Sequence, residues 1–144
     1  MIDIANKKDI TRIAKASGKI YLKQETINKI KNKEVKKGDV ETIAKIAAIN
    51  GVKKVPEIIP LCHPIPIMKI DIEYNYNQDH SITVYCIVKS IAKTGVEMEA
   101  LTGVSLALLN IWDLVKMYEK NEEGQYPSTI IKDIKVEKKI KVRD

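Results

Sequence analysis

The chain has little of several residue types, and each shortage excludes a class of protein. Its 144 residues include no Phe, two His and two Cys. Cys62 and Cys86 form no C-x-x-C pair and fit a reducing compartment, although the sequence leaves one disulfide between them open. Two isolated histidines provide no zinc-binding pattern. No run of eighteen apolar residues and no cleavable leader is present, so we expect a cytoplasmic protein.

The charge balance is basic but dispersed. The chain carries 25 basic and 19 acidic residues, a net charge of +6. Lysines gather in only two stretches, residues 29–37 and 132–141, which are typical of solvated faces and edge strands. The excess of positive charge favours an anionic ligand. The length predicts a single domain over residues 1–144.

The first half of the sequence predicts a strand, a helix and a stiff loop. A short strand is expected over residues 18–23, followed by a polar and weakly helical connection over 26–35. Asp39 can cap a helix in which apolar residues recur at helical spacing, and Gly51 is a fitting end for it. Three prolines then make the loop 57–67 (EIIPLCHPIPI) stiff and extended.

The second half predicts a hairpin, a long helix and a last strand. Apolar and polar residues alternate over 68–76 and again over 82–88, with a turn between them. A helix is expected from Val96 to about Lys120. In the final strand four residues are expected to share a face: Ile134, Val136, Ile140 and Val142. The order strand, helix, strand, strand, helix, strand indicates an α+β protein with a ferredoxin-like antiparallel sheet and helices on one face.

The long helix carries ionisable residues among apolar ones, which is costly unless they have partners or a use. Apolar residues occur on all its sides, which predicts packing against a second chain. Glu99 and Asp113 are fourteen residues apart, so they face within about 40° of each other but lie roughly 21 Å apart along the axis. Asp113 and Lys116 are neighbours at i, i+3 and can pair. We therefore expect a composite site built from two subunits, in which the helices run antiparallel.

Several motifs in order resemble one known family. They are MIDI at the start with Thr11-Arg12, KKGDV (36–40), LCHPIPI (61–67) and KTGVEMEALTGVSLALLNIWDLVK (93–116). Together they closely resemble the molybdenum cofactor biosynthesis protein C family, the cyclic pyranopterin monophosphate synthases. The resemblance covers about residues 1–120. It implies a ferredoxin-like fold, hexamers made as trimers of dimers, and an active site at a subunit interface.

The resemblance also implies a reaction and a set of residues. The family converts 3′,8-cyclo-7,8-dihydroguanosine 5′-triphosphate into cyclic pyranopterin monophosphate and releases diphosphate. Such chemistry needs cations for the triphosphate and acid/base groups for ring opening and closure. By motif, Lys37 and Lys116 correspond to essential lysines and Asp113 to the catalytic acid. The residues that correspond to substrate-contacting or pocket-lining positions are Leu61, Cys62, His63, Met98, Glu99, Glu97 and Arg12.

The physical role of each polar group is a hypothesis. Lys116, held beside Asp113, would donate or accept a proton, and Lys37 would be an electrostatic partner or a second proton-transfer group. Arg12 suits bidentate phosphate binding. One of the two helix glutamates, Glu97 or Glu99, would recognise the guanine-like N–H edge. No motif supports a cofactor, although magnesium can accompany a triphosphate.

Two other readings stay open. Ferredoxin-like sheets host RNA-binding domains, and Tyr74, Tyr76 and Tyr85 lie on the predicted hairpin, but the aromatic strand motif of such domains is absent. A structural scaffold would leave the charged residues without a common use. One departure from the family is the C-terminal segment KKIKVRD, where many members carry a Gly/Ser/Lys-rich tail. We therefore expect any role of that tail in covering the site to be absent or supplied otherwise.

Overall fold

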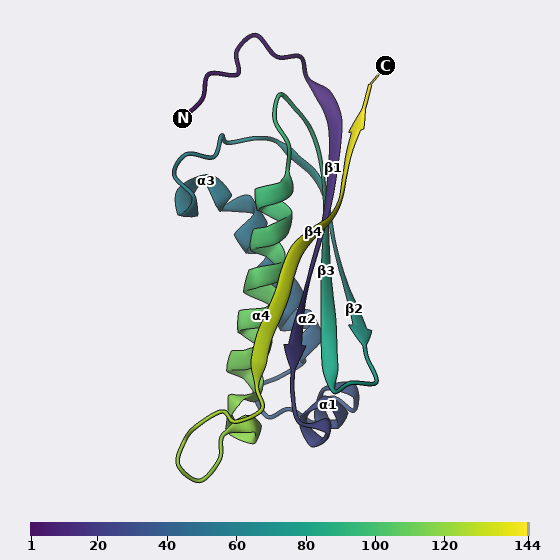
Figure 1. Cartoon of the computed structure of the whole chain (residues 1–144), viewed down its shortest axis with the longest axis vertical. Helices are drawn as coiled ribbons and strands as arrows, with labels where there is room; N and C mark the ends of the chain where they lie inside the picture. Colours follow the sequence, from purple (N-terminus) through teal and green to yellow (C-terminus); the bar gives the residue numbers. More distant parts are fainter. Residues whose placement is uncertain (144) are drawn as a thin grey trace.

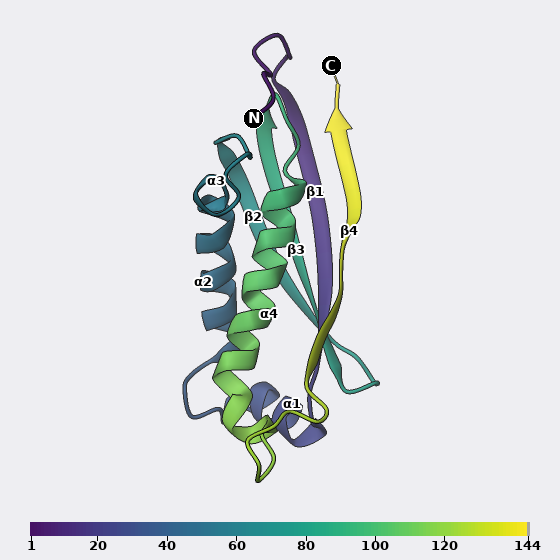
Figure 2. The same cartoon turned by 60° about the vertical axis from the view of Figure 1, so that its left-hand side comes forward.

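The computed structural model describes residues 1–143 and shows an α+β fold, in which a four-stranded sheet carries its helices on one face (Figure 1). The elements are β1 (Ile10–Tyr21), α1 (Gln24–Lys31), α2 (Val40–Lys53), α3 (Val55–Ile58), β2 (Ile67–Tyr76), β3 (Ser81–Ala92), α4 (Glu97–Glu119) and β4 (Ile130–Val142). The strand order is β2-β3-β1-β4, and every neighbouring pair is antiparallel. Figure 2 shows α2 and α4 side by side over the sheet, where they pack against each other.

The two long helices begin where the sequence predicts. Asp39 is the N-cap residue of α2, and α4 follows Val96 directly. The predicted end of α2 at Gly51 is wrong, because the helix continues to Lys53. A β-carbon at Gly51 would overlap the side chain of Leu106 in α4. The glycine therefore serves close packing of the two helices, not termination.

The core lies between α4 and the two central strands. The expected hairpin is present, and Val84, Cys86 and Val88 of β3 are fully buried on the helix side. A β-carbon at Gly18 of β1 would lie 2.8 Å from Leu108 Cδ1. Because α4 approaches the sheet this closely, the middle of the helix has little freedom to shift. By length and composition α4 is also apolar enough to cross a membrane, and half of its most apolar window is buried within this fold.

The first strand is longer than predicted. The sequence indicates a strand over 18–23, whereas β1 begins at Ile10 and ends at Tyr21. Its inward residues Ala14 and Ala16 are small, so the alternation of apolar and polar residues is weak in sequence. Pairing with β3 on one side and β4 on the other over this whole length overrides that weak pattern. The connection predicted as weakly helical over 26–35 contains a regular helix, α1, with Ile27 and Ile30 buried.

The last strand does not keep one face, so the prediction of a shared face for its four apolar residues is wrong. Val136 pairs with Ala16, whereas Ile140 pairs with Ile13, and the register shifts between them. Since Ala16 and Ile13 point to opposite sides of β1, this bulge turns Ile140 away from the helices. The same shift aligns Lys139 with Ala14, on the helix side of the sheet. The bulge thus decides which lysines of β4 reach the start of α4.

Candidate functional site

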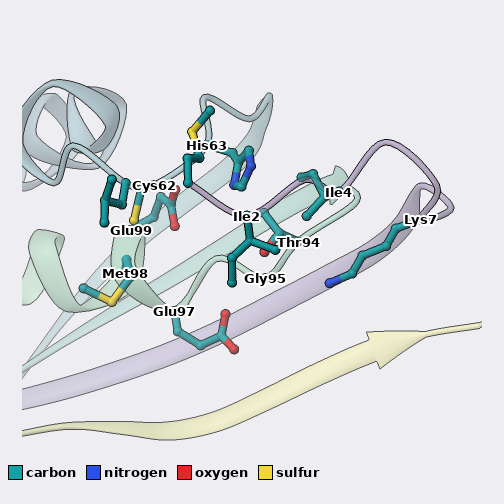
Figure 3. Close-up of a pocket in the computed structure, with 12 residues that line it drawn as sticks. Ile2, Ile4, Lys7, Cys62, His63, Thr94, Gly95, Glu97, Met98 and Glu99 are labelled. Carbon is teal, nitrogen blue, oxygen red and sulfur yellow. The ribbon is translucent and has the colours of Figure 1, made fainter.

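A cavity of about 530 Å³ lies at the N-terminal end of α4. Three segments distant in sequence enclose it: the first residues of the chain, the proline-rich loop and the first turn of α4 (Figure 3). Six of the residues predicted for the site line this cavity: Leu61, Cys62, His63, Glu97, Met98 and Glu99. The proline-rich loop and the helix start therefore bring together the groups that their motifs indicated. The prediction that residues 57–67 are extended throughout is wrong, because α3 continues to Ile58 and the chain turns through residues 59–62.

The two glutamates of the first helical turn differ in their surroundings. Glu99 is only 3% exposed, and within residues 1–143 its carboxylate forms no ion pair. Its carboxylate lies beside Cys62 in Figure 3. Burial raises the pKa of Glu99, with a smaller contribution from the charge of Glu97, while a backbone hydrogen bond opposes the rise. Glu99 thus resists ionisation and can accept or donate a hydrogen bond inside the cavity.

The Glu97 side chain points away from Glu99 and toward β4 (Figure 3). It forms an ion pair with Lys139 of that strand. Burial raises the pKa of Glu97, but the hydrogen bond of Lys139, a backbone hydrogen bond and the charges of Lys139 and Arg12 together outweigh it, so the net change is downward. The carboxylate is therefore ionised at neutral pH. Its partner Lys139 was not among the residues predicted from the sequence, because only the bulge in β4 reveals which way it faces.

A second, basic hollow of about 370 Å³ adjoins the first and shares Lys7, Thr94 and Gly95 with it. The cations that line this hollow are Lys7, Lys8, Arg12, Lys139 and Lys141. Arg12 is largely buried and donates from Nε to the Ala92 carbonyl at 3.0 Å and from Nη2 to the Lys93 carbonyl at 3.2 Å. These bonds fix the orientation of its guanidinium. Such an arrangement of cations can hold an anion such as a phosphate group.

Three further predicted residues meet near the other end of α4. Lys116 Nζ lies 2.8 Å from Asp113 Oδ1, which confirms the predicted pair. Lys37, from the connection between α1 and α2, donates to the Asp113 carbonyl at 2.9 Å and lies 3.4 Å from Asp113 Oδ2. The hydrogen bond and charge of Lys116, followed by the charge of Lys37, lower the pKa of Asp113. Reciprocally, the hydrogen bond and charge of Asp113 raise the pKa of Lys116.

This second cluster opens to solvent beside an apolar hollow. Asp113 and Lys116 line a hollow of about 470 Å³ together with Leu109, Trp112 and Tyr126. The Trp112 and Tyr126 rings are stacked at a tilt, 5.1 Å between centroids. Leu109 is 56% exposed there. Exposed apolar surface rimmed by charged side chains is typical of a surface that another molecule covers.

The two clusters lie on one helix but remain apart. Glu99 and Asp113 occupy positions fourteen residues apart in the regular helix α4, so their backbones are roughly 21 Å apart along the axis. The chain by itself therefore divides the predicted site residues into two groups. One group holds the glutamates, the proline-rich loop and Arg12, and the other holds Lys37, Asp113 and Lys116.

The two cysteines are free, so the disulfide that the sequence left open is not formed. Cys86 is buried in the core, which raises the pKa of its thiol to about 12. Burial and the charge of Glu99 also raise the pKa of Cys62. Within residues 1–143, no three His, Cys, Asp or Glu side chains lie close enough to hold a metal ion.

These features define the class of the protein: an α+β domain in which a hollow lined by cations adjoins a cavity lined by two glutamates, an arrangement suited to an anionic ligand that also presents hydrogen-bond donors. The chain belongs to the MoaC family, whose model matches residues 1–141. A relative from Sulfurisphaera tokodaii is 55% identical over 144 residues, covering 100% of this chain and 95% of the relative. Relatives from Pyrococcus furiosus (55%) and Archaeoglobus fulgidus (54%) align over 141 residues, 98% of this chain and 90% of each relative. All three are named probable cyclic pyranopterin monophosphate synthase.

Proposed function

We propose that this chain acts in molybdenum cofactor biosynthesis, where it converts 3′,8-cyclo-7,8-dihydroguanosine 5′-triphosphate into cyclic pyranopterin monophosphate and diphosphate. The observation that carries the proposal is family membership over almost the whole chain, together with the charged groups at both ends of α4. We also place the enzyme in the cytoplasm.

Substrate binding can be divided between the two adjoining hollows. The basic hollow with Arg12 and Lys139 suits the triphosphate, since its cations converge and Arg12 is held by backbone carbonyls. The neighbouring cavity then receives the guanine-derived ring. Of the two glutamates, Glu99 suits the N–H edge of that ring, because it is buried, unlike Glu97, and forms no ion pair within residues 1–143. Glu97 instead orients Lys139 toward the phosphates.

Proton transfer is assigned to the cluster of Asp113, Lys116 and Lys37. The Asp113 carboxylate contacts both ammonium groups, so it holds them in fixed places. Lys116 is the proton donor or acceptor of the reaction in this proposal. Lys37 stabilises negative charge that develops during ring closure and loss of diphosphate, or it transfers a second proton.

A complete site then requires two chains. The clusters lie too far apart along α4 for a small ligand to contact both in one chain. If two α4 helices cross antiparallel, the glutamates of one subunit approach Asp113 and Lys116 of the other, and the apolar hollow beside Leu109 becomes covered. The strand order β2-β3-β1-β4 supports a ferredoxin-like arrangement of each subunit. We propose a hexamer built as a trimer of such dimers.

A single-turnover assay tests the reaction. Purified protein is mixed with fresh cyclic dihydro-GTP, and diphosphate and the pterin product are measured for wild type, Lys116→Ala and Lys120→Ala. Lys120 is the C-cap residue of α4 and lines none of the three hollows described above. Lys120→Ala therefore removes one lysine from the same helix without altering the proposed site. We expect product from wild type and Lys120→Ala only. No product from well-folded wild type would refute the proposed reaction.

Mixing two inactive variants tests the shared site. Lys116→Ala and Glu99→Ala are unfolded and refolded together in equal amounts. If each site takes Lys116 from one subunit and Glu99 from the other, random pairing leaves about one quarter of the sites with both wild-type residues, and activity returns to that extent. If both residues served one site within the same chain, no mixed oligomer would regain activity.

A further inference from the structure

The connection that carries Lys37, residues 32–39, is mostly exposed. Its own contacts include a hydrogen bond from the Gly38 N–H to the Val35 carbonyl at 3.1 Å and an ion pair of Lys33 with Asp39 at 3.7 Å, and neither reaches the Lys37 side chain. Lys33 and Gly38 adopt positive φ, at 56° and 136°, so the chain turns sharply at both ends of this segment. Of the described residues in this connection, only Val35 packs into the core. Lysine has a long, flexible side chain, and an exposed loop alone would leave its ammonium group poorly placed. Something outside the connection must hold Lys37.

The C-terminal turns of α4 provide that hold at two points. The Lys36 backbone N–H donates to Tyr118 Oη at 2.9 Å. One residue further, Lys37 Nζ donates to the Asp113 carbonyl at 2.9 Å. Tyr118 lies two residues after Lys116 on the same helix. A single stretch of α4 therefore fixes both the backbone just before Lys37 and the ammonium group at its end.

The helix that precedes the connection is attached to the same turn of α4. Glu119 is fully buried and accepts hydrogen bonds from the Lys23 backbone N–H at 3.2 Å and from the Thr26 hydroxyl, at the start of α1. The Thr129 hydroxyl also donates to it, at 2.7 Å. Near the end of α1, Lys29 Nζ lies 5.1 Å from the centre of the Tyr118 ring. These contacts fix the base from which the connection starts.

From these contacts we infer that Tyr118 is a positioning residue for Lys37. Its hydroxyl holds the Lys36–Lys37 backbone at the distance from α4 at which the Lys37 ammonium group reaches Asp113, beside Lys116. The inference rests on the proposed function, since it assigns Tyr118 to the cluster in which proton transfer takes place. Tyr118 acts through Lys37 and is not assigned a contact with substrate. Small displacements of a catalytic group cost rate, so loss of the hydroxyl should appear in kcat.

Tyr118→Phe tests this with little disturbance, because the ring and its contact with Lys29 remain. The Lys36 N–H lies at the surface, where water can replace the lost acceptor, so thermal stability should stay the same. A single net hydrogen bond corresponds to about a two- to tenfold change in rate, and we expect kcat to fall by that factor with KM unchanged. Amide hydrogen exchange at Lys36 should become faster. The matched control is Tyr21→Phe, which removes an exposed hydroxyl that donates to Asp79 Oδ2 at 3.2 Å and not to the connection.

Each outcome decides between explanations. If the wild type is active and Tyr118→Phe has the same kcat, the positioning role is overturned. A rise in the KM of Tyr118→Phe would also overturn it, because that would mean that the hydroxyl contacts substrate. An equal loss of kcat in Tyr21→Phe, or a lowered Tm, would mean that the effect is general. Inactive wild type would refute the proposed reaction instead, and in that case faster exchange at Lys36 would still show whether Tyr118 holds the connection.

Discussion

Replacing Lys139 by Ala is the sharpest test of how the structure divides the site, because sequence reasoning did not select this residue. The bulge in β4 brings Lys139 to the helix side of the sheet, where it pairs with Glu97 and lines the basic hollow. If the hollow holds the triphosphate, the substitution removes one cation from the phosphates. It also leaves Glu97 without its ion-pair partner, so that only the nearby charge of Arg12 opposes its negative charge.

The size of the effect follows from the exposure of the side chain. Lys139 is 46% exposed, so its interaction with a phosphate about 4 Å away lies between the bulk-water value of about 1 kcal/mol and the value of about 4 kcal/mol near a protein surface. A loss of about 1–2 kcal/mol is expected, which corresponds to roughly a 5- to 30-fold decrease in kcat/KM. The free energy of unfolding should change by less than about 1 kcal/mol, because a half-exposed ion pair contributes little.

The neighbouring residue supplies the control. Lys138 pairs in register with Lys15 on the opposite face of the sheet, so Lys138→Ala removes the same charge from the other side of β4. Steady-state kinetics of both variants, with Tm as a measure of folding, separate a local effect from a change in net charge. Equal losses in the two variants, or an unaffected Lys139→Ala, would refute the assignment of this hollow to the phosphates.

Three further predictions concern other parts of the site and the core. Glu99→Gln should weaken substrate binding and raise Tm at pH 7. Burial raises the pKa of Glu99, so at any pH above the pKa of the unfolded state the ionised carboxylate opposes folding, and Gln removes that cost. The gain in Tm should vanish below about pH 4, where the carboxyl is protonated in both the folded and the unfolded state. Asp113→Asn should move the basic limb of the kcat–pH profile to lower pH, since Asp113 raises the pKa of Lys116, and an unmoved limb would contradict this role. Gly103→Ala should destabilise the protein by about 1–2 kcal/mol in urea unfolding, because a β-carbon there would lie 2.5 Å from Cys86 Sγ and the overlap outweighs the better helix propensity of Ala; a more stable variant would show that the core yields easily.

Much of the local structure could be predicted from the sequence. The hairpin and the long helix α4 have clear periods of two and 3.6 residues, and both are found close to the predicted limits. The pair of Asp113 and Lys116 was predictable for the same reason, since residues three apart on a helix must be neighbours. The 21 Å separation of Glu99 from Asp113 also follows from helix geometry alone, so it required no knowledge of packing.

Long-range register could not be predicted, because it depends on contacts between segments far apart in the chain. The bulge that orients Lys139 is visible only when β4 is paired with β1, and the contact of Lys37 with Asp113 joins residues 76 positions apart. The difference between Glu97 and Glu99 is likewise tertiary, since burial and a partner on β4 set it. The sequence by itself determined the hairpin, the long helix α4, the family and the residues that carry charge, because these follow from local periodicity and motifs. Only the tertiary structure decided which charges meet, because burial and strand register arise when distant segments pack together.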